Sequence, residues 1–207
     1  MPLRIVDHPL VQDALAELRD ARTRQPAFRR AADRISMLLA AEALRELPTT
    51  ATTVTTPLGP ADGRVVTTDI VVVPVLRAGL GMLEAVLELV PSARVGHIGL
   101  QRDEATAEAS KYYSKLPPDL SNSYVLMIDP MLATGGSAAA AIDLIKSAGA
   151  RAIRMLCIVS APDGVQLLET RHPDVVVYTP VIDPELNARK FIVPGLGDFG
   201  DRLYGTL

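Results

Sequence analysis

Tryptophan is absent from the 207-residue sequence, cysteine occurs once, and aromatic residues make up only 4%. So few aromatic side chains are poorly suited to a stacking platform for single-stranded nucleic acid. A single cysteine cannot form an intrachain disulfide, and it leaves a zinc site without its usual thiolates. Neither sign of charge dominates, because 21 Lys and Arg stand against 24 Asp and Glu, a net charge of −3. That balance argues against nucleic-acid binding but leaves a local basic patch open.

Long apolar runs are also missing. No stretch approaches the roughly 18 apolar residues of a membrane span, and residues 1–7 carry no apolar signal core. We therefore expect a soluble, cytoplasmic protein without a membrane partner. Hydrophobic residues make up 48%, which is typical of a globular chain. The length suits one α/β domain with a sizeable core.

Periodicity along the chain predicts an α/β architecture. Apolar residues at helical spacing predict two helices, at 10–18 and from 27 to about 47. Residues 49–68 are rich in threonine and turn signals, which predicts an extended hairpin or arm. Apolar runs then predict strands at 70–76, 94–100, 124–128, 152–159 and 175–178, with helices at 79–90, 137–148 and 163–171.

Continuous apolar strands separated by helices indicate a mostly parallel sheet covered on both faces. Pro74 lies inside the first of these strands, which we expect to bend or end near it. We interpret the whole chain, 1–207, as a single domain. Its parts are N-terminal helices (1–48), the arm (49–68), a core (69–180) and a C-terminal segment (181–207).

The most informative segment is the end of the strand at 124–128. Asp129 follows it, and a short loop then reaches Thr134-Gly135-Gly136-Ser137 where a helix begins. Free amides at a helix start favour a phosphate monoester, the glycines allow close approach, and the hydroxyls add donors. Asp129 would repel a phosphate, but it can accept hydrogen bonds from sugar hydroxyls. The spacing predicts a ribose 5-phosphate site, with an Asp-Pro turn and a Ser N-cap as the alternative.

Two arginines follow predicted strands. Arg77 comes after the first strand and Arg102 after the second, at the edge where open α/β sheets bind ligands. A guanidinium group matches phosphate oxygens in a fork geometry and keeps its charge. Taken singly, either arginine could equally be an ordinary surface residue.

The sequence of residues 129–137, Asp-Pro-Met-Leu-Ala-Thr-Gly-Gly-Ser, resembles the phosphoribosyl pyrophosphate (PRPP) loop of type I phosphoribosyltransferases. Its Asp-Pro pair is similar to the uracil phosphoribosyltransferase branch of that family. The resemblance extends through residues 76–82, 112–116, 172–174 and 194–202 and covers nearly the whole chain. The threonine-rich arm matches least, and Phe199 stands where a small residue is expected.

The resemblance implies the type I fold, with a β-arm and a C-terminal hood over uracil. It assigns catalysis to Asp129, Arg77 and Arg102. It assigns PRPP binding to Arg77, Arg102, Asp129, Pro130, Met131, Leu132, Ala133, Thr134, Gly135, Gly136, Ser137 and Asp198. It places Ile192, Gly197, Asp198 and Phe199 around uracil.

The implied reaction joins uracil to PRPP and gives UMP and pyrophosphate. Charge stabilisation and alignment matter more here than a nucleophilic side chain. Mg²⁺ would be held through PRPP and water, with no direct protein ligand. Residues 103–116 would close over PRPP, and Asp198 is a candidate acceptor for the N1 proton. The resemblance also suggests a homo-oligomer and GTP as an effector, although no residue locates that site.

Several residues have simpler interpretations. His8, His97 and His172 show no metal-ligand spacing, so we expect caps or packing, and Cys157 is expected to be a core residue. Two alternative functions stay open. One is a nucleotide-sensing, RNA-binding regulator of pyrimidine genes on the same fold. The other is a purine-base transferase, which would normally carry a second acid after Asp129.

Overall fold

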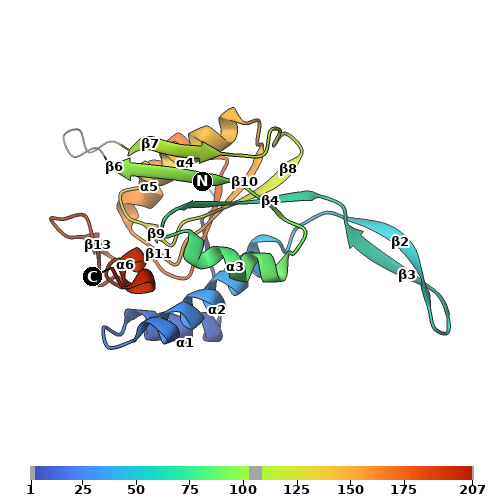
Figure 1. Ribbon diagram of the computed structural model, residues 1–207, viewed down its shortest axis with the longest axis horizontal. Coiled ribbons are helices and arrows are strands. Elements are labelled where there is room, and N and C mark those ends of the chain that lie inside the picture. Colours follow the sequence, from blue (N-terminus) through green and yellow to red (C-terminus); the bar gives the residue numbers. More distant parts are fainter. Residues whose placement is uncertain (1–2, 103–108, 207) are drawn as a thin grey trace.

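A mostly parallel sheet forms the centre of the molecule in the computed structural model, which describes residues 3–102 and 109–206 (Figure 1). Its strand order is β1-β12-β10-β8-β4-β6-β7, with β5 also paired to β4. The pairs are parallel except for β6 with β7. The strands are β1 (Leu3–Ile5), β4 (Asp69–Leu76), β5 (Arg94–Val95), β6 (His97–Arg102), β7 (Ala109–Lys115), β8 (Ser123–Ile128), β10 (Ala152–Leu156) and β12 (Val176–Thr179). The predicted fold class is confirmed.

Helices cover both faces of this sheet (Figure 1). They are α1 (Pro9–Arg19), α2 (Gln25–Ala43), α3 (Leu80–Leu89), α4 (Gly136–Ser147), α5 (Pro162–Arg171) and α6 (Phe199–Tyr204). Side chains alternate along β4: Val72 joins the core cluster under α1–α3, while Val71 and Val73 join the one under α4 and α5. Among the described residues, no helix combines the length and apolarity needed to cross a membrane.

The first two predicted helices form, with one different boundary. His8 caps α1, because its Nδ1 accepts a hydrogen bond from the Leu10 amide at 3.1 Å, one of the two roles expected for the histidines. Helix α2 ends at Ala43, about four residues before the predicted end. The difference follows from Pro48, which disfavours helical backbone at the preceding Leu47.

The first core strand, expected to bend or end near Pro74, ends two residues beyond it. Strand β4 continues to Leu76, and Pro74 pairs with Ile128 of β8. On its other side β4 changes partner from β5 to β6, and Gly96 between them donates to the Val72 carbonyl. Because backbone groups alternate in direction, the Pro74 nitrogen faces this interrupted side, where a missing N–H costs little.

Short elements and the arm complete the fold. Strands β2 (Thr49–Thr56) and β3 (Gly59–Val66) form the predicted hairpin, which projects from the body of the molecule (Figure 1). Strand β9 (Met131–Leu132) pairs with β11 (Val159–Ser160), and β13 (Glu185–Leu186) pairs with β14 (Ile192–Val193). Within the predicted lid, residues 109–115 form the edge strand β7, while residues 103–108 lie outside the described residues.

Candidate functional site

The site lies at the carboxyl ends of β4 and β8. These neighbouring strands run parallel and in register, so the residues after Leu76 and Ile128 emerge at the same edge. Gly79 allows the segments after these two strands to approach each other, because a Cβ at this position would lie 2.5 Å from the Ile128 carbonyl oxygen. The fold thereby brings the loop of Ala78 beside Asp129.

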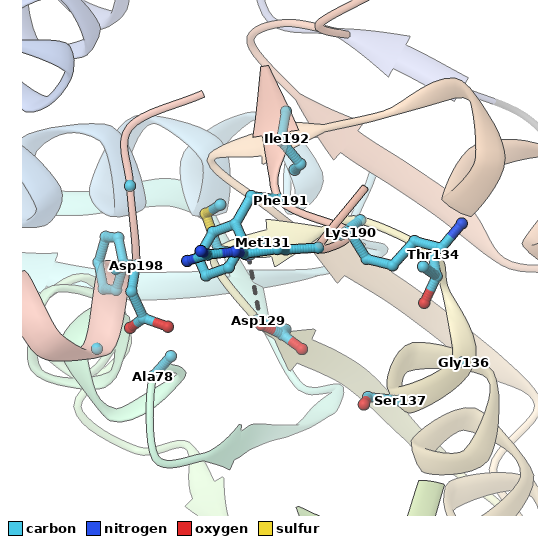
Figure 2. A pocket seen from close by; sticks show the side chains of 15 residues that line it. Ala78, Asp129, Met131, Thr134, Gly136, Ser137, Lys190, Phe191, Ile192 and Asp198 are labelled. Atoms are coloured by element: carbon cyan, nitrogen blue, oxygen red, sulfur yellow. Dashed lines mark hydrogen bonds between the residues drawn. The ribbon is translucent and has the colours of Figure 1, made fainter. Parts of the chain in front are cut away.

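A cavity of about 360 Å³ opens at this edge (Figure 2). Its walls come from three places in the sequence: the loop after β4, the segment from β8 into α4, and the C-terminal segment. The lining residues are Ala78, Asp129, Met131, Ala133, Thr134, Gly136, Ser137, Arg189, Lys190, Phe191, Ile192, Gly197, Asp198, Phe199 and Gly200. Ten of these are predicted site residues, so the fold joins the phosphate segment to the C-terminal segment.

Asp129 lies between these walls (Figure 2). Burial raises the pKa of its carboxyl group from 3.8 to about 7, and a hydrogen bond from the Met131 amide at 3.3 Å lowers it only in part. Desolvation disfavours the charged form, and among the described residues no cation pairs with the carboxylate to offset this effect. A ligand that donates hydrogen bonds to this carboxylate would supply the missing partners.

The start of α4 forms the second wall. Thr134, Gly136 and Ser137 line the cavity, and no side chain caps the helix, so its first-turn amides keep their donor capacity. Gly135 has φ +83°, and a Cβ there would lie 3.0 Å from the Gly164 backbone. Only glycine fits this turn without strain. The helix dipole and free amides make this wall suited to an anion.

Three predicted residues of the same segment do not line the cavity. Pro130 offers its carbonyl to the amides of Ile158 and Val159, at 2.9 and 3.0 Å. Leu132 is 1% exposed and packs into the core, and Gly135 packs against α5. Their contribution to the site is therefore the shape of the loop.

The C-terminal segment forms the third wall. Ile192, Gly197, Asp198 and Phe199, which the resemblance places around uracil, all line the cavity. Asp198 also caps α6, since its Oδ1 accepts from the Asp201 amide at 2.9 Å. The Phe199 ring is 1% exposed and packs 5.2 Å from the Phe28 ring. The large side chain at this position is thus accommodated in the core.

A partly buried ion pair holds the C-terminal segment against α1. Both terminal guanidinium nitrogens of Arg19 donate to Asp183, at 2.7 and 2.9 Å, and Asp183 is 3% exposed. The same two side chains bind Gly195: its amide donates to Asp183 at 2.8 Å, and its carbonyl accepts from Arg19 at 2.9 Å. Arg202 adds bonds to the carbonyls of Leu18, Asp20 and Leu196. Sequence reasoning did not identify this network.

The two predicted arginines lie at strand ends, and Arg77 does not line the cavity. The Arg77 side chain is 64% exposed, and its guanidinium lies 4.0 Å from the Asp201 carboxylate. It is therefore free to turn toward a ligand. Arg102 ends β6, and its backbone pairs with Ala109; its side chain lies outside the described residues.

Sequence reasoning also missed five lining residues: Ala78, Arg189, Lys190, Phe191 and Gly200. Ala78 and Gly200 lie inside the matching segments but carry no polar side chain to single them out. The adjacent cations Arg189 and Lys190 were an available signal, since they lie in the C-terminal segment just before Ile192.

The remaining titratable candidates have structural roles. His172 is 3% exposed, its Nε2 lies 3.2 Å from the Ala139 carbonyl, and burial lowers its pKa. Burial raises the pKa of the Cys157 thiol to about 12, so it stays protonated. Among residues 3–102 and 109–206, no group of three or more His, Cys, Asp or Glu could hold a metal ion.

Comparison with known proteins gives a consistent result. Residues 5–206 match the family model described as uracil phosphoribosyltransferase. The chain is 52% identical to a uracil phosphoribosyltransferase of Dictyoglomus turgidum over 203 residues, which cover 98% of each chain. It is 49% identical to one of Thermus thermophilus over 207 residues and the full length of both.

Solved structures support the fold. A protein of Aquifex aeolicus superposes with a TM-score of 0.92 at 35% identity, covering 98% of this chain and 97% of that one. A purine phosphoribosyltransferase of Pyrococcus horikoshii gives a TM-score of 0.50 at 19% identity, covering 74% and 87%. The second likeness concerns the fold alone.

Proposed function

The chain belongs to the uracil phosphoribosyltransferase family, and from that premise we propose which residues of its cavity bind PRPP and uracil for the transfer that yields UMP and pyrophosphate. The single observation that carries the proposal is the shared cavity. It has an uncapped helix start and a buried carboxylate on one side, and a glycine-rich main chain on the other.

In this proposal the amides and hydroxyls of residues 134–137 bind the 5-phosphate of PRPP. The dipole of α4 and the absent cap support that assignment. Asp129 accepts hydrogen bonds from the ribose hydroxyls. Because such donors favour the ionised carboxylate, sugar binding lowers the pKa of Asp129 from about 7.

Arg77 and Arg102 bind the pyrophosphate. Arg77 follows β4 and Arg102 ends the neighbouring parallel strand β6, and the exposed Arg77 side chain has room to turn toward a leaving group. Their fixed charge stabilises negative charge as the bond from C1′ to pyrophosphate breaks. No protein nucleophile is needed, since alignment of the two substrates supplies the advantage.

The main chain around Ile192 and Gly197–Phe199 recognises uracil. A rigid backbone can complement its two carbonyl acceptors and the N3–H donor, whereas cytosine would leave groups unpaired, which gives ~10⁴-fold or greater rejection. The Arg19–Asp183 pair that binds Gly195 supports this rigidity. Asp198 lines the same wall and is the candidate acceptor of the N1 proton.

The side chains present fit a magnesium ion held mainly by substrate. Asp129 and Asp198 are the cavity's carboxylates, and Mg²⁺ usually combines one or two carboxylates with phosphates and water. We propose that the ion would be held mainly through PRPP and water, with no direct protein ligand, while Asp129 would accept hydrogen bonds from the ribose hydroxyls. Bound there, Mg²⁺ would neutralise charge on the leaving group.

The direct test incubates purified protein with Mg²⁺, PRPP and each free base in turn, while nucleotide and pyrophosphate are measured. We expect UMP from uracil only, and a loss of at least about 100-fold in Asp129→Ala and Arg77→Ala with the fold retained. Arg151→Ala is the control, because this exposed arginine precedes β10 at the opposite edge of the sheet. Activity with hypoxanthine but not uracil would contradict the proposal.

A further inference from the structure

The turn between β13 and β14 is built by one side chain. Asn187 Oδ1 accepts hydrogen bonds from the amides of Arg189 and Phe191, at 2.9 and 3.0 Å. The Asn187 amide donates to the Phe191 carbonyl at 2.9 Å, and its carbonyl accepts from the Lys190 amide at 2.8 Å. These four bonds fix the backbone of a three-residue hairpin loop, residues 188–190.

Lys190 occupies the position of this loop that glycine favours. Its φ is +65°, and among the described residues it is the non-glycine residue with a positive φ. Three-residue hairpin loops commonly place a left-handed residue last, and glycine takes that conformation without cost. A lysine here is strained, and strained residues of this kind cluster at ligand sites.

The Lys190 side chain extends toward the second wall of the cavity, which the start of α4 forms (Figure 2). Lys190 and Thr134 both line the cavity, and Figure 2 shows the lysine stem extending toward Thr134. Among the residues that the structure describes, its ammonium group has neither an ion pair nor a hydrogen bond. An unpaired cation that lines the same cavity as uncapped amides and hydroxyls can complete a site for an anion, because both sides would then donate to the same oxygens.

We propose that Lys190 is a further substrate-binding residue, whose ammonium group binds the phosphate monoester held at residues 134–137. This assignment rests on the proposed function, since it names a second ligand for the same phosphate. Lys190 reaches that phosphate from the C-terminal segment, so it ties the wall that binds the base to the wall that binds the sugar phosphate.

The test compares UMP with uridine, which differ only in the 5′-phosphate, by calorimetric titration of the wild type and Lys190→Gly. Glycine keeps the left-handed backbone, so the variant's thermal midpoint stays equal or rises. We expect UMP affinity to fall about 3- to 10-fold and uridine affinity to stay unchanged. Lys190→Arg, which keeps the charge, restores most UMP affinity. Arg151→Ala, which removes one distant positive charge, leaves both affinities unchanged.

Two results overturn the assignment while leaving the proposed function intact. In both, the wild type makes UMP from uracil and PRPP. One is a Lys190→Gly variant that binds UMP as tightly as the wild type does. The other is an equal loss for UMP and uridine, which would place the contact on the nucleoside. A wild type that makes no UMP would overturn the proposed function, and the assignment with it.

Discussion

Asp129 is shielded enough from solvent to raise its pKa, while its proposed role needs its charge. Its folded pKa of about 7 exceeds the value of about 3.9 expected in the unfolded chain, so the folded state binds the proton more tightly. Stability from this group is therefore fully present below about pH 4 and is lost as the pH rises through 7. The native protein accepts this cost at neutral pH, which favours a functional reason for an acid at this position.

Replacing the carboxyl group by an amide removes that pH dependence. We expect Asp129→Asn to raise the free energy of unfolding, with a gain about 1–3 kcal/mol larger at pH 8 than at pH 5. Denaturant unfolding at both pH values measures it. Asp62→Asn, at an exposed position on the arm, controls for loss of one negative charge. Equal gains at both pH values would show that the carboxyl is ionised in the folded protein.

Asp183 offers a second test at this scale. Asp183→Asn weakens both bonds from Arg19 and leaves that guanidinium partly buried without its counter-ion. We expect a loss of about 1–3 kcal/mol in stability, and a KM for uracil that rises more than the KM for PRPP because Gly195 loses its anchor. Glu17→Gln breaks an exposed pair on the same helix and is expected to cost less than about 1 kcal/mol. An unchanged KM for uracil would contradict the positioning role.

Some of these residues could be predicted from the sequence, and others could not. The segment of Asp129 and Thr134–Ser137 could be predicted because strand, loop and helix start are adjacent in the sequence. The Arg19–Asp183 pair could not, because its members are 164 residues apart and no local pattern relates them. The position of the Lys190 side chain could not be predicted either, because it depends on the left-handed backbone of a short hairpin loop.

At the scale of elements, the loop into α4 depends on its contact with α5. Gly135→Ala would place a methyl group 3.0 Å from the Gly164 backbone in a left-handed conformation. We expect it to lower stability by about 1–3 kcal/mol and to weaken PRPP binding, because the first turn of α4 must shift. Thermal unfolding and titration measure both effects.

Gly136→Ala is the matched control for stability. A Cβ at Gly136 meets only Thr134 Oγ1, at 4.0 Å, and the backbone is helical. We expect its midpoint to stay within a degree or two of the wild type or to rise. Equal losses in the two variants would mean that the contact with α5 does not explain the effect of Gly135→Ala.

Elements differ in how well the sequence predicts them. The apolar strands β4 and β8 and the helices α1 and α4 carry strong periodicity, and their predictions are confirmed within a few residues. Strand β7 is a polar strand at the edge of the sheet, and β13 and β14 have two residues each. None of the three gives a usable hydrophobic pattern. Lys190 and Phe191 reach the cavity only because of that short hairpin, which explains why these two lining residues were missed.

At the scale of the molecule, the homo-oligomer stays a prediction, and the N-terminal helices and the arm are the candidates for its contacts. The arm projects from the body, with Leu58 99% exposed and Val54 and Val66 about half exposed (Figure 1). Replacing residues 53–62 by an Asn-Gly turn keeps the Thr52–Gly63 pair. We expect sedimentation to show a smaller assembly while circular dichroism stays native. An unchanged assembly would contradict this role for the arm.

The central claim is that one cavity holds a phosphate at the start of α4 and a base against the C-terminal main chain. A crystal structure with UMP tests it most directly. We expect the phosphate on the amides of residues 134–137, the ribose hydroxyls at Asp129, and the uracil edge on the backbone of residues 192–199. A nucleotide bound elsewhere, or bound here with its base at the α4 wall, would contradict the account.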